Sequence, residues 1–268
     1  MSAQDIQPGP EFSNGLVGVA RALHDTSGTP SPTIFSKEFS LADRVALVTG
    51  GNSGIGLESA LAFVEAGVRA VYCLDISLNP SAEWTKVKEF ASRLQCKAGA
   101  GRLEYISVDV SNQGIWKVAQ DIGDKEGRLD ICLAGAGIIG PSEDSLTLKA
   151  SDYRKLMEVN LDGVLYTAQA AGQQMQRFNG GGSIILLASV LGHQSMPGSS
   201  PHLAYEVAKG GVLQIARSFA CELATKGIRV NSISPGFVRT NMVAPLLATL
   251  PEERRLASLS PTGRIGSE

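Results

Sequence analysis

The sequence predicts an α/β protein built on a single doubly wound parallel sheet, a Rossmann fold. Short apolar runs typical of buried strands alternate with amphipathic helical segments from about Phe39 onward. The first apolar run leads directly into a glycine-rich turn and then a helix. Polar residues suited to chemistry follow later strands, at the carboxyl ends where such a sheet binds ligands.

The expected elements alternate along the chain. Strands are predicted at 45–49, 69–74, 103–108, 130–134, 183–188 and 228–233. Helices are predicted near 55–66, 81–94, 113–124, 152–178, 203–226 and 241–257. Connections of helical length between strands favour parallel pairing with right-handed crossovers. Since α/β sheets often use this many residues as one unit, residues 37–268 are expected to form one dinucleotide-binding and catalytic domain.

Residues 1–36 stand apart from this pattern. Prolines at 8, 10, 30 and 32 lie among Ser, Thr and Gly residues, which predicts a flexible N-terminal extension that packs loosely or caps an oligomer. Asp5, Glu11 and Asp25 argue against a transit peptide, which is basic and poor in acids. A cytoplasmic protein is therefore expected.

Composition argues against several partners. The chain is 43% hydrophobic and 19% charged, with a net charge of -2 and a pI near 6.0, so nothing favours binding to nucleic acid or an anionic membrane. No apolar run approaches the roughly 18 residues of a membrane helix. The four cysteines form no CxxC pair and the three histidines have no metal-ligand spacing, so reduced thiols and no metal are expected.

The turn after the first strand reads TGGNSGIG over residues 49–56. Free amides and the positive end of the following helix favour a pyrophosphate there. Gly50 permits the tight turn, Gly54 lets a phosphate approach the backbone, and Gly56 lets the helix pack on the strand. The predicted cofactor-binding residues of this turn are Gly50, Asn52, Ser53, Ile55 and Gly56.

Asp75 ends the second predicted strand. A carboxylate at this position accepts hydrogen bonds from the adenosine ribose hydroxyls and repels a 2′-phosphate. No Arg or Lys follows at Ile76 or Ser77 to bind such a phosphate. The alternative is a solvated residue in a turn. The sequence favours NAD(H) and leaves NADP(H) open.

Tyr205 and Lys209 are four residues apart in a helical stretch, so their side chains share one face. A free phenol ionises near pH 10, and a neighbouring ammonium favours the phenolate, which predicts a general acid/base. Ser189, at a strand end, could donate to a substrate oxygen. Asn160, at a mid-helix position that disfavours Asn, could hold a water connected to Lys209.

Each of these residues also has a structural interpretation. Tyr205 could be a packed helix residue with Lys209 extended beside it, and Ser189 could be an ordinary loop serine. Asn160 could bond its own backbone. Taken together, the four predict proton transfer to an alcohol or carbonyl beside a nicotinamide.

In order and spacing these residues resemble the short-chain dehydrogenase/reductases, from about Phe39 to the end of the chain. The matching marks are TGGNSGIG at 49–56, Asp109, Asn160, Ser189, YEVAK at 205–209 and PGFVRT at 235–240. The resemblance implies that Tyr205 is the acid/base and that Lys209 binds the nicotinamide ribose and lowers the pKa of Tyr205. It also implies that Ser189 polarises the substrate oxygen and that Asn160 serves a proton relay.

The remaining cofactor contacts are implied by the same resemblance. Asp109, with Val110, would meet the adenine. Ala134 and Gly135 would contact the cofactor through their backbone. Pro235, Val238 and Thr240 would hold the carboxamide and phosphate side of the cofactor.

The pattern is most similar to fungal polyol and sugar-alcohol dehydrogenases, such as arabinitol or mannitol dehydrogenases and sorbose reductases. The implied substrate is a polyol, a sugar alcohol or a secondary-metabolite alcohol or ketone. A homodimer or homotetramer through the helices 152–178 and 203–226 is also implied.

Three departures from the family pattern stand out. The family's Asn-Asn-Ala-Gly is AGAG at 134–137, the loop from Ser189 to Tyr205 is long, and the chain ends at Glu268, where members continue into one more helix and strand. The sheet is therefore expected to lack its last helix and strand. An active NAD(P)(H)-dependent oxidoreductase is the first interpretation, and a truncated, cofactor-binding relative that is poorly active or regulatory is the alternative.

Overall fold

The computed structural model describes residues 39–94, 101–140, 144–196 and 202–267. These residues form a six-stranded parallel sheet with the strand order β3-β2-β1-β4-β5-β6. Its strands are β1 (Val45–Thr49), β2 (Ala70–Asp75), β3 (Arg102–Ser107), β4 (Ile131–Ala134), β5 (Gly182–Leu187) and β6 (Ile228–Ile233). The predicted doubly wound parallel sheet is confirmed. The predicted extension 1–36 lies outside the described residues.

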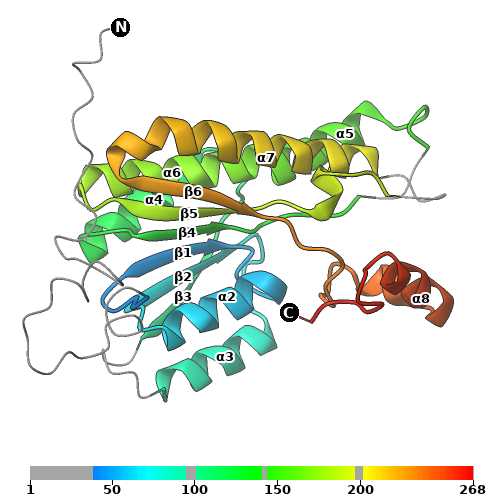
Figure 1. Ribbon diagram of the computed structural model, residues 1–268. Coiled ribbons are helices and arrows are strands. Elements are labelled where there is room, and N and C mark those ends of the chain that lie inside the picture. The colour runs from blue at the N-terminus through cyan, green and yellow to red at the C-terminus, as the bar shows by residue number, and fades with distance from the viewer. Residues whose placement is uncertain (1–38, 95–100, 141–143, 197–201, 268) are drawn as a thin grey trace, which may run out of the picture.

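Helices cover both faces of the sheet (Figure 1). One face carries α2 (Gly54–Glu65) and α3 (Ala82–Ser92), and the other carries α4 (Gly114–Glu126), α6 (Gly163–Arg177) and α7 (Leu203–Leu223). The strand order reverses between β1 and β4, and the carboxyl ends of strands at such a switch point flank a ligand-binding crevice. Among the described helices, none is long and apolar enough to cross a membrane.

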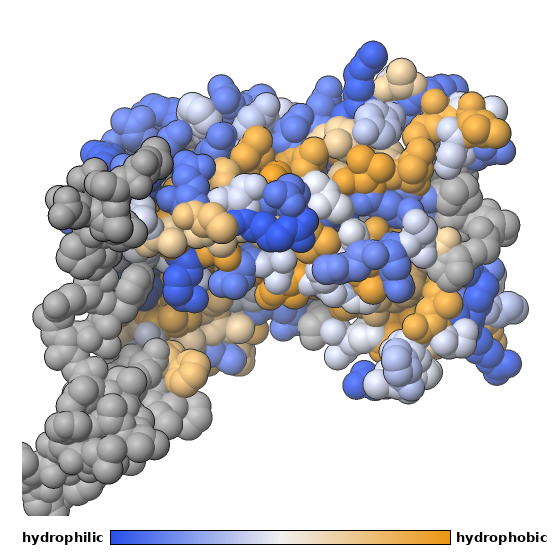
Figure 2. Space-filling view, turned by 45° about the horizontal axis from the view of Figure 1, so that its top comes forward, coloured by the Kyte–Doolittle hydropathy of each residue, from blue (hydrophilic) through white to orange (hydrophobic). Residues whose placement is uncertain are grey.

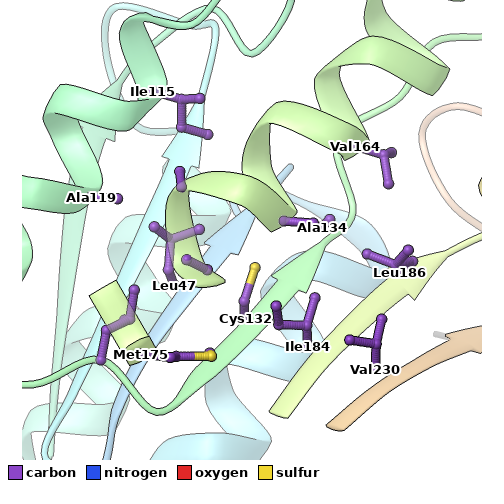
Figure 3. Packing of buried hydrophobic residues seen from close by; sticks show 14 of the residues in the cluster. Leu47, Ile115, Ala119, Cys132, Ala134, Val164, Met175, Ile184, Leu186 and Val230 are labelled. Atoms are coloured by element: carbon purple, nitrogen blue, oxygen red, sulfur yellow. The ribbon is translucent and has the colours of Figure 1, made fainter. Parts of the chain in front are cut away.

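The alternation of side chains along β1 divides the core between the two faces. Val45 and Leu47 belong to the cluster under α4 and α6, whereas Ala46 and Val48 belong to the cluster under α2. All of β1 is buried, which is why its sequence reads as one continuous apolar run. Figure 3 shows Leu47 beside Cys132 and Met175 in the first cluster.

Ion pairs to the buried Asp130 fix the amino ends of β1 and β4. Asp130 accepts hydrogen bonds from Arg44 at 3.1 Å, from Arg128 at 2.7 Å and from the Val45 amide at 2.9 Å. Burial acts to raise the pKa of Asp130, but the hydrogen bonds from Arg128 and the Val45 amide outweigh it and hold that pKa below its usual range. This charged cluster anchors β1 and β4 at the end opposite the crevice.

Two predicted helices differ from the structure. The predicted helix 152–178 is interrupted, because α5 (Ala150–Met157) passes through a π-helical turn at Glu158–Asp162 before α6 begins. The predicted single helix 241–257 is wrong, since a short 3₁₀ turn at Ala244–Leu247 is followed by a new helix, α8 (Leu250–Ser258). Both pieces carry Pro in their first turn, and a proline there starts a helix but cannot continue a preceding one.

The end of the described chain returns to the segment that follows β6. Gly266 pairs with Val238 as an isolated parallel bridge, and the Arg239 amide donates to the Gly266 carbonyl at 2.9 Å. Within the described residues β6 pairs only with β5 and forms one edge of the sheet. The expected absence of a further helix and strand stays a prediction.

Candidate active site

The glycine turn between β1 and α2 has a geometry that disfavours residues with a side chain. Gly50 and Gly54 have φ values of 70° and 57°, in the left-handed region that favours glycine. A Cβ atom on Gly56 would lie 2.2 Å from the Gly50 carbonyl oxygen. Gly50 and Gly56 therefore let the start of α2 pack directly against the turn.

The start of α2 fits a phosphate group. Ser53 is the N-cap residue, and its side chain makes no capping hydrogen bond. The first amides of a helix have no partner within the helix, and the helix dipole adds positive potential there. Ser53, Ile55 and Gly56 line the same cavity as Tyr205. A glycine cradle with free amides at a helix start matches the pyrophosphate of a dinucleotide.

Asn52 connects the glycine turn to the start of α3, and its predicted contact with the cofactor stays a prediction. Its buried side chain accepts a hydrogen bond from the Ser81 amide at 2.8 Å, and Ser81 Oγ donates to the Asn52 carbonyl at 2.9 Å. Ser81 also caps α3 by accepting from the Trp84 amide at 3.0 Å. Asn52 therefore joins the turn to α3.

Asp75 and Asp109 lie at or just after neighbouring strand ends. The Gly51 amide donates to the Leu74 carbonyl, which brings the end of β2 beside the glycine turn, and the Val108 amide donates to the Asp75 carbonyl. The Asp75 carboxylate accepts from the Ser77 amide at 3.3 Å, and the Asp109 carboxylate accepts from the Ser111 amide at 2.9 Å. Both carboxylates thus stabilise their own turns, and their predicted contacts with the adenosine stay a prediction.

The AGAG segment after β4 is held by Thr49. Its hydroxyl oxygen accepts from the Gly135 amide at 3.1 Å and from the Ala136 amide at 3.3 Å. A Cβ atom on Gly135 would lie 2.9 Å from the Thr49 carbonyl oxygen. The segment after β4 is therefore held against β1 by the Thr49 hydroxyl.

Asn160 lies fully buried in the π-helical turn. Its Oδ1 accepts from the Ile138 amide at 3.0 Å, and its Nδ2 donates to the Ile138 carbonyl at 2.9 Å. The side chain thus bonds the backbone of the chain beyond β4, and its predicted link to Lys209 through a water stays a prediction. A Cβ atom on Gly137 would lie 2.8 Å from Asn160 Oδ1 and 3.8 Å from Lys209 Nζ, so these side chains border the same small space. Single π-turns are frequent at functional sites.

Lys209 lies deep beneath the crevice, with only 3% of its surface exposed. Its Nζ donates to the Leu187 carbonyl at 2.7 Å and lies 5.7 Å from the centre of the Tyr205 ring. Burial lowers the pKa of Lys209 to about 8, because a charge without solvent is disfavoured. The ammonium is therefore held at the end of β5 by one backbone oxygen.

Burial raises the pKa of Tyr205, and a side-chain hydrogen bond with Ser189 acts in the opposite direction. Ser189, itself buried, uses Oγ to accept from the Leu191 amide at 3.1 Å. Its own proton can therefore point toward an oxygen in the crevice. The expected lowering of the Tyr205 pKa by Lys209 stays a prediction.

One cavity of about 180 Å³ brings most of the predicted residues together. Its lining includes these predicted residues: Gly50, Ser53, Ile55, Gly56, Gly135, Asn160, Ser189, Tyr205, Lys209, Pro235, Val238 and Thr240. Asn52, Asp75, Asp109, Val110 and Ala134 are not part of this lining. Gly137, Leu187, Gly236 and Asn241 also line the cavity and were not predicted. Leu187 contributes its backbone carbonyl, and a backbone group leaves no signal in the sequence.

A glycine turn that fits a phosphate, beside the side chains of Ser189, Tyr205 and Lys209, is typical of a dinucleotide-dependent oxidoreductase, and the comparison with known proteins agrees. A sequence model described as short chain dehydrogenase matches residues 44–251. The chain belongs to this family, and it is an oxidoreductase of the kind that uses NAD(P) to interconvert alcohols and ketones.

The similarity extends over most of each relative. The chain is 36% identical to a sorbose reductase of Schizosaccharomyces pombe over 85% of both chains. It is 32% identical to a short chain dehydrogenase/reductase of Aspergillus versicolor, over 89% of this chain and 82% of the relative. A short-chain dehydrogenase/reductase crystal structure from Mycobacterium marinum has a TM-score of 0.76 at 30% identity, over 87% of each chain.

Proposed function

We propose that this chain interconverts a secondary alcohol and a ketone, with Tyr205 as the group that moves the proton. The observation that carries the proposal is the convergence of Ser189, Tyr205 and Lys209 on the cavity that the glycine turn also lines. When bound, the nicotinamide supplies or accepts the hydride. The protein's own part is to hold the substrate oxygen between Ser189 and Tyr205.

Each residue has a distinct part in this proposal. The Ser189 hydroxyl donates to the substrate oxygen as negative charge develops. Tyr205 donates its phenolic proton to that oxygen in reduction and receives it in oxidation. The Lys209 ammonium, fixed on the Leu187 carbonyl, stabilises the phenolate that remains. Asn160 keeps the chain beyond β4 in place and takes part in returning the proton to Tyr205.

We infer NAD(H) as the preferred cofactor from Asp75. Its carboxylate is at the end of β2, beside the glycine turn, where it can accept from ribose hydroxyls. Within the described structure Ile76 and Leu78 follow it with exposed apolar side chains, so this loop offers no cation for a 2′-phosphate. NADP(H) is expected to bind more weakly.

The decisive experiment follows the absorbance of reduced nicotinamide with a panel of alcohols and ketones. Tyr205→Phe is expected to lower turnover by at least about 10²- to 10³-fold, the contribution of a general acid/base, with cofactor affinity little changed. Tyr153→Phe is the matched control, because it removes a phenol from α5 and Tyr153 is not part of the cavity lining. Cofactor binding without turnover by the unaltered protein would favour the regulatory alternative.

We also propose a homodimer or homotetramer through the helices 152–178 and 203–226. Leu203 and Val207 lie one turn apart on α7, and each is 41% exposed. Figure 2 shows hydrophobic residues gathered among hydrophilic ones on the face formed by the upper helices of Figure 1. Light scattering of the unaltered protein and of Val207→Glu tests this, with a monomer in the unaltered protein as the contrary result.

A further inference from the structure

The short 3₁₀ turn Val190–Gly192 directly follows Ser189 and determines where the serine hydroxyl lies. Ser189 Oγ accepts from the Leu191 amide at 3.1 Å, and the Ser189 carbonyl accepts from the Gly192 amide at 2.9 Å. The side chain and the backbone of Ser189 are therefore both bonded to this turn. A displacement of the turn would carry the hydroxyl with it.

Gly192 brings this turn against the backbone of α7. A Cβ atom added at Gly192 would lie 2.7 Å from the Lys209 carbonyl oxygen, 2.8 Å from the Lys209 carbonyl carbon and 3.0 Å from the Gly210 nitrogen. Ordinary van der Waals contact of a Cβ atom begins at 3.4 Å. The three atoms belong to the helix backbone, which cannot move aside as the end of a flexible side chain can. The close approach of the turn to α7 therefore requires glycine at this position.

The opposite side of the turn is fixed by the segment that follows β6. The Val190 amide donates to the Pro235 carbonyl at 2.9 Å, and His193 Nε2 lies 3.0 Å from Ser234 Oγ. The turn thus lies between two parts of the chain and cannot retreat from α7 without stretching these bonds. This arrangement sets the spacing between the serine beside the turn and the phenol on α7.

We propose that Gly192 is a positioning residue that sets the distance between the Ser189 hydroxyl and the Tyr205 phenol. This inference rests on the proposed function, in which these two groups hold one substrate oxygen. A side chain at position 192 would separate the turn from α7 by several tenths of an ångström. Since both groups must reach the same oxygen, such a displacement slows the chemical step and leaves the glycine turn at the start of α2 unchanged.

Steady-state kinetics of Gly192→Ala give the first test, with the alcohol and ketone of the panel that are turned over fastest. The value of kcat is expected to fall about tenfold or more, whereas the affinity for NADH stays within about twofold, because misplacement by about 1 Å can cost about 100-fold in rate. Gly210→Ala is the matched control, since it adds a methyl group to the same contact from α7. Its Cβ atom would lie 3.6 Å from the Gly192 carbonyl oxygen, in ordinary contact. Equal kcat in the two variants overturns the inference.

A double-mutant cycle separates positioning from a general structural defect. Ser189→Ala removes the hydroxyl that the turn positions, and kcat is expected to fall about 10²-fold or more. Adding Gly192→Ala to Ser189→Ala is then expected to lower kcat by less than about threefold, because the hydroxyl to be displaced is absent. Losses that multiply in the double variant overturn the inference.

A milder variant applies if circular dichroism shows that Gly192→Ala does not fold. Ser234→Ala removes the partner of His193 and loosens the turn from the side of β6 without adding an atom. It is expected to lower kcat at least about threefold, the effect of one neutral hydrogen bond, and to lower it much less in the Ser189→Ala background. Unchanged kcat in Ser234→Ala then overturns the inference. If Ser189→Ala and Tyr205→Phe both retain full turnover, the proposed function fails and the inference fails with it.

Discussion

The Glu206 carboxylate accepts a hydrogen bond from the Met196 amide at 2.8 Å. The bond joins the first turn of α7 to the loop that follows Ser189, at the residue adjacent to Tyr205. Met196 is buried, so this single contact links the position of the loop after Ser189 to the helix that carries Tyr205. Glu206 is thereby a positioning residue.

Removing this contact is expected to affect substrate binding more than chemistry. Glu206→Ala should raise KM for the alcohol about tenfold, since a hydrogen bond to a charged group contributes about 1.5–3 kcal/mol, while kcat changes less. Glu206→Gln retains an acceptor oxygen and serves as the control. Steady-state kinetics with both variants check the split, and an unchanged KM in Glu206→Ala would contradict the assignment.

The buried Lys209 predicts a pH-dependent stability. Its folded pKa is about 8, below the roughly 10.4 of an unfolded lysine, so from about pH 8 to 10.4 the unfolded chain binds more protons. The cost of burying this charge is fully present below pH 8 and is relieved as the pH rises through that window. Lys209→Met should therefore have a higher melting temperature than the unaltered protein at pH 7. The difference in melting temperature between the two proteins should be smaller at pH 9.5.

The difference in melting temperature between Lys209→Met and the unaltered protein should fall by several degrees from pH 7 to pH 9.5, since about 1 kcal/mol corresponds to roughly 2–4 °C in a chain of this size. Thermal unfolding of both proteins at the two pH values measures it. Lys226→Met is the control, because this lysine lies in the short turn after α7, away from the cavity. A gap that stays constant with pH would show that Lys209 does not titrate as its burial indicates.

The glycine turn predicts a loss of cofactor binding in Gly56→Ala. The added Cβ atom would lie 2.2 Å from the Gly50 carbonyl oxygen, so the turn or the start of α2 must shift. NADH affinity, measured by fluorescence titration, is expected to fall at least about tenfold, since misplaced amides lose charge-assisted hydrogen bonds. Gly180→Ala is the matched control, because a Cβ atom there meets nothing within 4 Å. Equal NADH affinity in both variants would contradict this prediction.

Asp75 predicts a switch of cofactor. Asp75→Ser with Ile76→Arg should move the ratio of NADPH to NADH affinity at least about tenfold toward NADPH, because arginine binds phosphate in a bidentate manner. Asp121→Ser, on the exposed side of α4, is the control. Tighter binding of NADPH than of NADH by the unaltered protein would refute the role given to Asp75.

Local patterns made much of this structure predictable. The continuous apolar run of β1 predicted a buried strand. The spacing of Tyr205 and Lys209 predicted that their side chains share one helix face, and both residues line the cavity. The π-turn at Asn160 could not be predicted, because one inserted residue hardly changes the spacing of apolar residues along a helix. The bond between Asn52 and Ser81 joins positions 29 residues apart, so only the folded chain determines it.

Two prolines mark the break before α8 in the sequence. Pro245 and Pro251 lie within the predicted helix 241–257, and a proline at either position removes a helical hydrogen bond. The hydrogen bond between Glu206 and the Met196 amide could not be predicted from the sequence. A carboxylate in the first turn of a helix is common, and only the fold brings the Met196 amide to it.

The salt bridges around Asp130 have an evolutionary consequence. They tie the amino ends of β1 and β4, whereas Ser189 and Tyr205 lie at the cavity beyond the carboxyl ends of the strands. A strand of five residues separates the two ends by about 16 Å. Mutations in the substrate-facing loops therefore leave the anchoring charges untouched, and such a scaffold can acquire a new specificity while it continues to fold.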